Sequence, residues 1–403
     1  MIKIKHQAFA HLSMGYKKMF FILALLLSFA NNTIKAQDAS RLRISLLTCT
    51  PGDELYSIFG HSAIRIIDST SLTDYTFNFG TFDFDDEGFY IKFMRGKLLY
   101  FVSIERTDDF IQSYMAMNRG VTEQVLDLSA TEKIALQHKL LENAKEENKF
   151  YKYDFFLDNC TTRLRDFITH NIHPTPALPA VMPANTSYRD AIHQYLDKGH
   201  QPWSELGIDI LLGCRTDKIM TAAEQEFLPD NLMSAIDSCR NKKLVQKKSV
   251  IYQQLMNNDS ATPTSPAVLF TALFIFVTLI TLINNRFSSI LVNIFDNIFF
   301  FAVGWLGLLL ILMWVATDHS MTKDNFNLLW ALPTHLLLPF LKKSSTSFAH
   351  KYFSFSFYWT AATLLFWFFL PQQLNIALLP IDLIIFIRTG DRLAKIKKAN
   401  KAL

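Results

Sequence analysis

The stretch "FFLDNCTTRLRDFI", residues 155–168, joins a run of aromatic residues to a predicted helix and places Cys160 at the junction. Asp158 and Asn159 stand directly before the helix, and both residue types are favoured at helix N-caps. A cysteine in the first helical turn lies near free backbone N–H groups and the positive end of the helix dipole, which lower the pKa of a thiol. The stretch therefore predicts a nucleophilic cysteine, with a small, inert core residue as the alternative.

A histidine that could act as the base lies far upstream. His61 follows Gly60 and opens "HSAIRIID" (61–68), whose alternation of apolar and polar residues predicts a strand. Thiol–imidazole catalysis requires the two side chains within hydrogen-bonding reach, which their separation along the sequence does not prevent. We take Cys160 and His61 as the candidate catalytic pair. The alternative for His61 is an ordinary polar group at the end of a strand.

The residues around this pair predict a mixed fold. Alternating apolar patterns predict strands, and from residue 129 onward the period changes to that of helices. Predicted strands cover residues 42–50, 61–68, 75–84 and 96–106, with a turn and short helix at 51–60. Ser129–Glu132 and Thr221–Glu224 have the spacing of capping boxes. This order predicts an α+β domain in which a small antiparallel sheet precedes the helices.

Composition and the N-terminal segment indicate an exported membrane protein. Half of the 403 residues are hydrophobic, the net charge is only +4, and no basic stripe indicates nucleic-acid binding. Lys17 and Lys18 precede the apolar run "MFFILALLLSFA" (19–30), which predicts a secretory signal peptide, with an uncleaved anchor as the alternative. The expected divisions are a signal peptide at 1–36, an exported domain at 37–258, a Ser/Thr/Pro linker at 259–266, a transmembrane domain at 267–390 and a basic cytoplasmic tail at 391–403.

Five apolar segments follow the exported domain, and their flanking charges predict an orientation. The segments cover residues 267–283, 298–316, 327–341, 352–370 and 374–387. A span needs about 20 apolar residues, and five crossings that start outside end inside. Basic residues then concentrate in cytoplasmic loops and at a cytoplasmic C-terminus, as the positive-inside rule requires. These residues are Arg286, Lys342, Lys343, Lys351, Arg388, Arg392, Lys395, Lys397 and Lys398.

The outer loop after the second segment, "TDHSMTKDN" (317–325), carries polar side chains at the membrane surface. Asp318, His319 and Asn325 there face the exported domain, where they could contribute to a site at the level of the lipid headgroups. The alternative is a plain interfacial loop beside a tryptophan belt. Prolines in the next segment predict a re-entrant element lining a groove, because irregular backbone is tolerated at membrane depth only where protein or a cavity surrounds it.

Several motifs together resemble a known bacterial family. "LLTCTPGDELYSIFGHSAIRI" (46–66) and "YKYDFFLDNCTTRLRDF" (151–167) look like the family of Lnb-type lipoprotein N-acyltransferases, as do "FNFGTFDF" (77–84) and "TDHSMTKDNFNLLWALP" (317–333). The resemblance covers roughly residues 40–390. The order of histidine and cysteine also resembles circularly permuted papain-like enzymes of the NlpC/P60 superfamily. By this resemblance Cys160 corresponds to the nucleophile and His61 to the catalytic histidine.

The resemblance implies a reaction between two lipids at the bacterial inner membrane. A phospholipid would donate an acyl chain to Cys160, and the thioester would acylate the α-amino group of a lipoprotein's diacylglyceryl-cysteine. No cofactor or metal is expected. Two alternatives stay open: a membrane-anchored cysteine hydrolase, acting as a phospholipase or peptidoglycan amidase, and a binding domain without chemistry.

The remaining site residues follow less directly from the sequence. On a hairpin turning near residues 69–73, the residues facing His61 fall around 81–83, so Asp83 is the candidate to orient it, with Asn78 as a weaker one. Arg65, Arg163 and Arg165 could contact a lipid phosphate or form ordinary salt bridges. His170 and His173 lack the companions of a metal site. A Cys214–Cys239 disulfide is left open.

Overall fold

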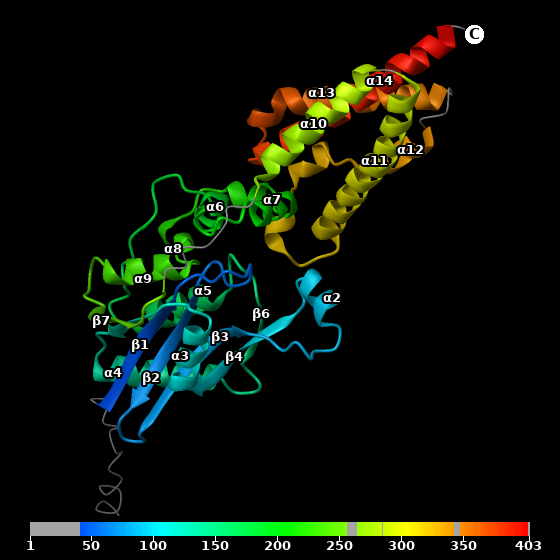
Figure 1. Cartoon of the computed structure of the whole chain (residues 1–403). Coiled ribbons are helices and arrows are strands. Elements are labelled where there is room, and N and C mark those ends of the chain that lie inside the picture. The colour runs from blue at the N-terminus through cyan, green and yellow to red at the C-terminus, as the bar shows by residue number, and fades with distance from the viewer. Residues whose placement is uncertain (1–40, 256–263, 284, 342–346, 402–403) are drawn as a thin grey trace, which may run out of the picture.

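The computed structural model describes residues 41–255, 264–283, 285–341 and 347–401. The predicted signal peptide at 1–36 and most of the predicted linker lie outside the described residues. Figure 1 shows a domain of sheet and helices at one end of the chain and a group of long helices at the other.

A seven-stranded antiparallel sheet forms the centre of the first domain. Its order is β6-β4-β3-β2-β1-β5-β7, and each pair of neighbours is antiparallel. The strands are β1 (Leu42–Cys49), β2 (His61–Asp68), β3 (Thr73–Thr81), β4 (Leu99–Arg106), β5 (Val121–Leu126), β6 (Phe150–Lys152) and β7 (Val245–Tyr252). The four predicted strands are present, although β3 ends at Thr81 and not at residue 84. The expected α+β arrangement is therefore confirmed for this domain.

Helices pack on both faces of this sheet, α3 on one face and α4, α5 and α9 on the other. The helices of the domain are α2 (Phe89–Met94), α3 (Thr107–Ala116), α4 (Ala130–Asn143), α5 (Cys160–Asn171), α6 (Tyr188–Lys198), α7 (Pro202–Leu211), α8 (Ala222–Gln225) and α9 (Pro229–Asp237). The predicted capping boxes at Ser129–Glu132 and Thr221–Glu224 are both formed. The short helix expected within 51–60 is wrong, because the chain makes hydrogen-bonded turns there.

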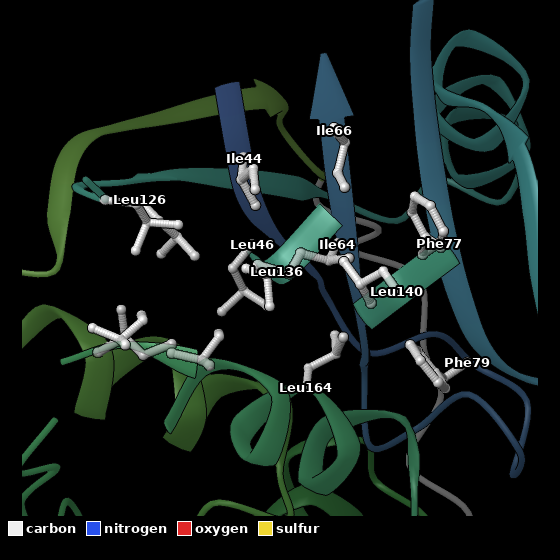
Figure 2. Close-up of a cluster of buried hydrophobic side chains, with 14 of the residues drawn as sticks. Ile44, Leu46, Ile64, Ile66, Phe77, Phe79, Leu126, Leu136, Leu140 and Leu164 are labelled. Atoms are coloured by element: carbon white, nitrogen blue, oxygen red, sulfur yellow. The ribbon is translucent and has the colours of Figure 1, made fainter. Parts of the chain in front are cut away.

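The main hydrophobic core positions the start of α5 against the sheet. Figure 2 shows Ile64 of β2 and Leu164 of α5 directed into one apolar cluster with side chains of β1, β3 and α4. Both residues are fully buried, and burying a Leu or Ile side chain contributes about 1.5–3 kcal/mol. Leu164 lies one helical turn after Cys160, so this packing also fixes the cysteine beside the sheet.

Four long helices dominate the C-terminal region: α10 (Pro266–Ile283), α11 (Arg286–Val315), α13 (Ser347–Phe366) and α14 (Leu379–Lys401). By length and composition, α10 and α11 could cross a membrane. The predicted third span, residues 327–341, is not one continuous helix. It is broken into the short elements η4 (Phe326–Leu329), η5 (Pro333–Leu337) and α12 (Leu338–Leu341), since prolines interrupt regular helical hydrogen bonding. The number of crossings stays a prediction.

This broken segment packs closely against α11. A Cβ at Gly307 would lie 2.0 Å from the carbonyl oxygen of Ala331, and one at Gly304 would lie 2.6 Å from the backbone nitrogen of Leu336. The two glycines thus allow irregular backbone to lie directly on the helix, where Trp330 is almost fully buried. Such burial within protein is what irregular backbone requires at membrane depth.

Two of the basic residues used to predict the orientation are paired inside the helical region. Arg388 donates to both carboxylate oxygens of Asp296, at 2.8 and 3.0 Å, and Arg392 contacts the same carboxylate at 2.7 Å. Arg388 is fully buried. These two arginines of α14 therefore neutralise Asp296 of α11. The predicted orientation thus rests on the other lysines and arginines.

The loop after α11 joins the two parts of the chain. Asn325 donates to the carbonyl of Ile210 at 2.8 Å, at the end of α7. The backbone N–H of Gly213 donates to the carbonyl of Met321 at 2.8 Å. A Cβ at Gly213 would lie 1.8 Å from the carbonyl oxygen of Lys323, so only glycine permits this approach.

Candidate active site

Cys160 is the first residue of α5. Of the two predicted N-cap residues, Asp158 and Asn159, it is Asn159 that caps the helix. Its Oδ1 accepts hydrogen bonds from the N–H groups of Thr161 and Thr162 at 2.8 Å each. Asp158 instead accepts a bidentate pair of hydrogen bonds from Arg163, at 2.7 and 2.8 Å. Cys160 is 7% exposed as a residue and lines a cavity. The thiol is thus sheltered yet accessible from one side.

His61, at the start of β2, lies against this thiol. Both side chains line the same cavity, and the charge of each shifts the pKa of the other. The Nε2–H of His61 donates to Oδ1 of Asn78 at 2.7 Å, which leaves Nδ1 for the sulfur. Asn78 is itself oriented, because its Nδ2 donates to Glu105 at 2.9 Å. The structure thus brings Cys160 and His61 to one cavity, and their catalytic roles stay a prediction.

Asp83 does not take the orienting position predicted for it. The β2–β3 register pairs Ile64 with Phe77. If this pairing is extended by three residues, Gly80 lies opposite His61. Asn78 is then the diagonal neighbour on the same face, whereas an odd-numbered residue such as Asp83 would face the other way. β3 in fact ends before Asp83, which accepts the N–H of Asp85 in an exposed turn.

The surroundings of Cys160 and His61 favour a thiolate and an imidazolium. Burial alone would raise the pKa of Cys160, but the charge of His61 and hydrogen bonds from His61, from the Ser62 N–H and from Thr161 lower it to about 7. Burial alone would lower the pKa of His61, but the charge and hydrogen bond of Cys160, with Asn78, raise it. The pair therefore approaches the ion-pair form of an activated cysteine nucleophile near neutral pH.

The cavity that holds this pair has a volume of about 650 Å³. Its inner wall contains Cys160, His61 and Asn78, and His319 to Thr322 of the loop after α11 complete its lining. Several large apolar residues of the lining are also exposed at the protein surface. They are Leu55, Tyr56, Phe84, Phe93 and Met117.

Both parts of the chain match models of one protein family. The Lnb N-terminal periplasmic domain matches residues 29–194, and the Lnb transmembrane domain matches residues 257–400. This chain belongs to the Lnb family. The searches of curated proteins and of solved structures found no match. The Lnb assignment makes the chain a membrane protein with a periplasmic and a transmembrane domain, while the papain-like relationship stays a prediction.

The loop after α11 brings one predicted residue of this Lnb-family chain to the cavity. His319 lines it, and its Nε2–H donates to the carbonyls of Phe93 and Met94 at 3.2 Å each. Asp318 lies outside the lining and pairs with Lys152 at 3.0 Å. Asn325 is also outside it, because its side chain holds the end of α7. The loop thus contributes to the Lnb cavity through His319 to Thr322.

The arginines predicted to contact phosphate lie outside the lining of the cavity and are already paired. Arg65 donates to Asp74 and Glu123, at 2.8 and 3.2 Å. Arg163 stacks on Tyr151, with 3.5 Å from Cζ to the ring centroid, besides its two bonds to Asp158. Arg165 pairs with Asp166 at 2.8 Å. Their carboxylate partners make salt bridges the better description of all three.

One arginine that the sequence analysis passed over does line the cavity. Arg119 lies between α3 and β5, is 5% exposed, and stacks on Tyr114 with 4.7 Å from Cζ to the ring centroid. Its sequence context, a basic residue before Gly120, resembles an ordinary turn. The only available signal was its position two residues before a strand of the domain that holds the motifs.

In the described part of the chain, one group of side chains has the spacing of metal ligands: His193, Glu205 and Asp209. Asp209 already accepts hydrogen bonds from Arg189 at 2.6 Å and from His193 at 2.9 Å. These bonds satisfy the carboxylate within the protein. Cys214 and Cys239, left open as a disulfide, are free thiols.

Proposed function

We propose that this Lnb-family chain is a lipoprotein N-acyltransferase that works through a thioester on Cys160. The observation that carries the proposal is the Cys160–His61–Asn78 arrangement in a cavity whose wall is completed by the loop after α11. A cavity shared between a periplasmic domain and a membrane domain suits a reaction in which both substrates are lipids. The proposal places the protein in the bacterial inner membrane with its C-terminus in the cytoplasm.

The first half-reaction transfers an acyl chain from a phospholipid to the enzyme. The Cys160 thiolate attacks the ester carbonyl, the carbon–oxygen bond breaks, and His61 gives its proton to the departing glycerol alkoxide. The products are an acyl-enzyme thioester and a lysophospholipid. The N–H groups of Thr161 and Thr162 are used by the Asn159 cap, so we assign the N–H of Cys160 itself as an oxyanion donor.

The second half-reaction transfers the acyl chain to an amine. The α-amino group of the lipoprotein's diacylglyceryl-cysteine attacks the thioester, and His61 accepts the proton that the amine loses. The carbon–sulfur bond breaks, an amide forms and the Cys160 thiolate returns. Aminolysis of a thioester to an amide is downhill, which suits an amine acceptor. Asn78 keeps the imidazole in one orientation through both steps.

Mass spectrometry of lipoprotein N-termini tests the proposal directly. Cells with the gene should contain N-acylated lipoproteins, and cells that carry only Cys160→Ser should contain diacylated ones while the variant stays folded and inserted. Retained N-acylation in Cys160→Ser would exclude the thioester. Free fatty acid and lysophospholipid without an acylated acceptor would instead identify a hydrolase. Binding of lipid without any acyl-enzyme would identify a non-catalytic domain.

A further inference from the structure

Arg119 is a buried cation that has no anionic partner among the described residues. Its Nε donates to the carbonyl of Thr50 at 2.9 Å and its guanidinium lies over the ring of Tyr114. Its Nη2 has no hydrogen-bond partner. Among the residues that the structure describes, no carboxylate forms an ion pair with it. The guanidinium therefore retains hydrogen-bonding capacity that the fold does not use.

Other deeply buried arginines in the described chain are paired with carboxylates. Arg189 contacts Asp209 and Asp217, and Arg388 contacts Asp296. Burial of an uncompensated charge costs several kcal/mol, so protein interiors normally supply a counter-charge. Arg119 departs from that rule within the candidate active site, which is where uncompensated groups often serve a ligand.

The position of Arg119 relates it to the reacting groups. Tyr114 stacks on His61, with 6.2 Å between ring centroids, and Arg119 lies on Tyr114 at 4.7 Å. Arg119 is thus one aromatic ring away from the imidazole, in the same cavity. A Cβ at Gly52 would lie 3.0 Å from Cδ of Arg119 and 2.6 Å from Oγ of Ser57, so glycine lets the 51–57 turn close over the arginine stem.

We propose that Arg119 binds the phosphate diester of the phospholipid that donates the acyl chain. This inference rests on the proposed function and names the feature by which the donor is recognised. The planar guanidinium matches phosphate oxygens in geometry and charge. In a phospholipid the phosphate and the ester carbonyl are separated by only a few covalent bonds of glycerol. This short separation suits Arg119 and His61, which lie on either side of the single Tyr114 ring. The acceptor offers an amine in place of a phosphate, so Arg119 serves the first half-reaction.

The test compares two acyl donors with the full-length protein in detergent micelles. One donor is phosphatidylethanolamine, and the other is a diacylglycerol with the same acyl chains and no phosphate. The rate of acyl-enzyme formation is followed by mass spectrometry of the intact protein. We expect Arg119→Gln to lower the rate with phosphatidylethanolamine roughly 10- to 100-fold, as the loss of charge-assisted hydrogen bonds predicts, and to leave the diacylglycerol rate unchanged.

Arg163→Gln is the matched control. Arg163 also stacks on a tyrosine, but it is paired with Asp158 and lies outside the cavity lining. Its ratio of the two rates should equal the wild-type ratio. Arg119→Lys keeps the charge but lacks the planar guanidinium group. We expect its ratio of the phosphatidylethanolamine rate to the diacylglycerol rate to lie between the ratios of the wild type and of Arg119→Gln. If Arg119→Gln does not fold, the comparison is made with Arg119→Lys.

The outcomes separate this inference from the proposed function. An equal loss with both donors, or no loss with either, would overturn the phosphate assignment while leaving the acyltransferase intact. A wild-type protein that forms no acyl-enzyme from either donor would remove the proposed function and this inference with it. A loss confined to the phosphate-bearing donor supports both.

Discussion

The two ends of the β2–β3 hairpin differ in whether their polar groups are paired with partners of opposite charge. Near the turn, Arg65 is bonded to Asp74 and to Glu123, so its charge is fully matched. At the other end, His61 faces a thiol and an amide oxygen, and the nearby guanidinium of Arg119 keeps an unpartnered nitrogen. The paired end stabilises the sheet, whereas the unpaired end faces a cavity. Groups that the fold leaves unmatched are therefore the better guide to function.

The largest expected effect is at the unpaired end. His61→Ala removes the proposed general acid and base, so acyl transfer should fall roughly 10²- to 10⁴-fold. The same change raises the pKa of Cys160, because burial then acts without the counter-charge of the imidazolium. In the wild type, alkylation of Cys160 by iodoacetamide should rise with pH through about 7, since a lowered thiol pKa gives thiolate at lower pH. In His61→Ala this rise should move to higher pH.

Peptide mapping of the alkylated protein supplies an internal control. Cys49 is fully buried, and burial raises the pKa of its thiol, so it should stay unmodified over the same range. Identical alkylation profiles for Cys160 in wild type and His61→Ala would contradict the thiolate–imidazolium pair.

At the paired end we expect a loss of stability and normal chemistry. Arg65→Gln leaves Glu123 buried with less compensation, which should lower the free energy of unfolding by up to about 3 kcal/mol. The rate per folded molecule should stay at the wild-type value. Denaturant unfolding of the protein in detergent, with activity normalised to folded protein, measures both quantities. A specific loss of activity at unchanged stability would reverse the comparison between the two ends.

Asn78 and Asp83 give a smaller effect that separates two assignments. Asn78→Ala removes the bond that orients His61 and should slow acyl transfer about tenfold, the equivalent of one good hydrogen bond. Asp83→Ala should leave the rate unchanged, because Asp83 only bonds the exposed turn at Asp85. Kinetics of the two purified variants decide the question, and the opposite ranking would restore Asp83 as the orienting residue.

Local signals explain which parts of the site were predictable. The N-cap before Cys160 and the alternation after His61 depend on residues adjacent in sequence, so both elements were predicted at nearly their observed ends. The orienting residue depends on strand register, where an error of one residue exchanges the two faces of a strand. Arg65 and Arg119 could not be distinguished without their partners, because a salt bridge and an unpaired guanidinium look the same in the sequence.

The membrane region shows the same limit. Apolar segments reveal helices, and the prolines within 327–341 indicated an irregular element, but the close packing of that element on Gly304 and Gly307 depends on residues far away in the sequence. The pairing of Arg388 with Asp296 likewise joins residues far apart in the chain. Counting charges along the sequence could not separate these buried pairs from free basic residues at a membrane surface.

The smallest expected effect concerns the contact between the membrane loop and the cavity. His319→Ala removes a donor shared by the carbonyls of Phe93 and Met94, which holds α2 at the cavity. We expect normal protein abundance and a loss of roughly 3- to 10-fold in acyl transfer, since one hydrogen bond is worth about 1 kcal/mol and the bond also positions the lining. Lys152→Ala is the control, because it breaks only an exposed ion pair with Asp318, worth about 0–1 kcal/mol, outside the cavity. Equal activities in the two variants would reduce this loop to a structural connection, whereas a loss limited to His319→Ala makes the membrane domain a contributor to the site.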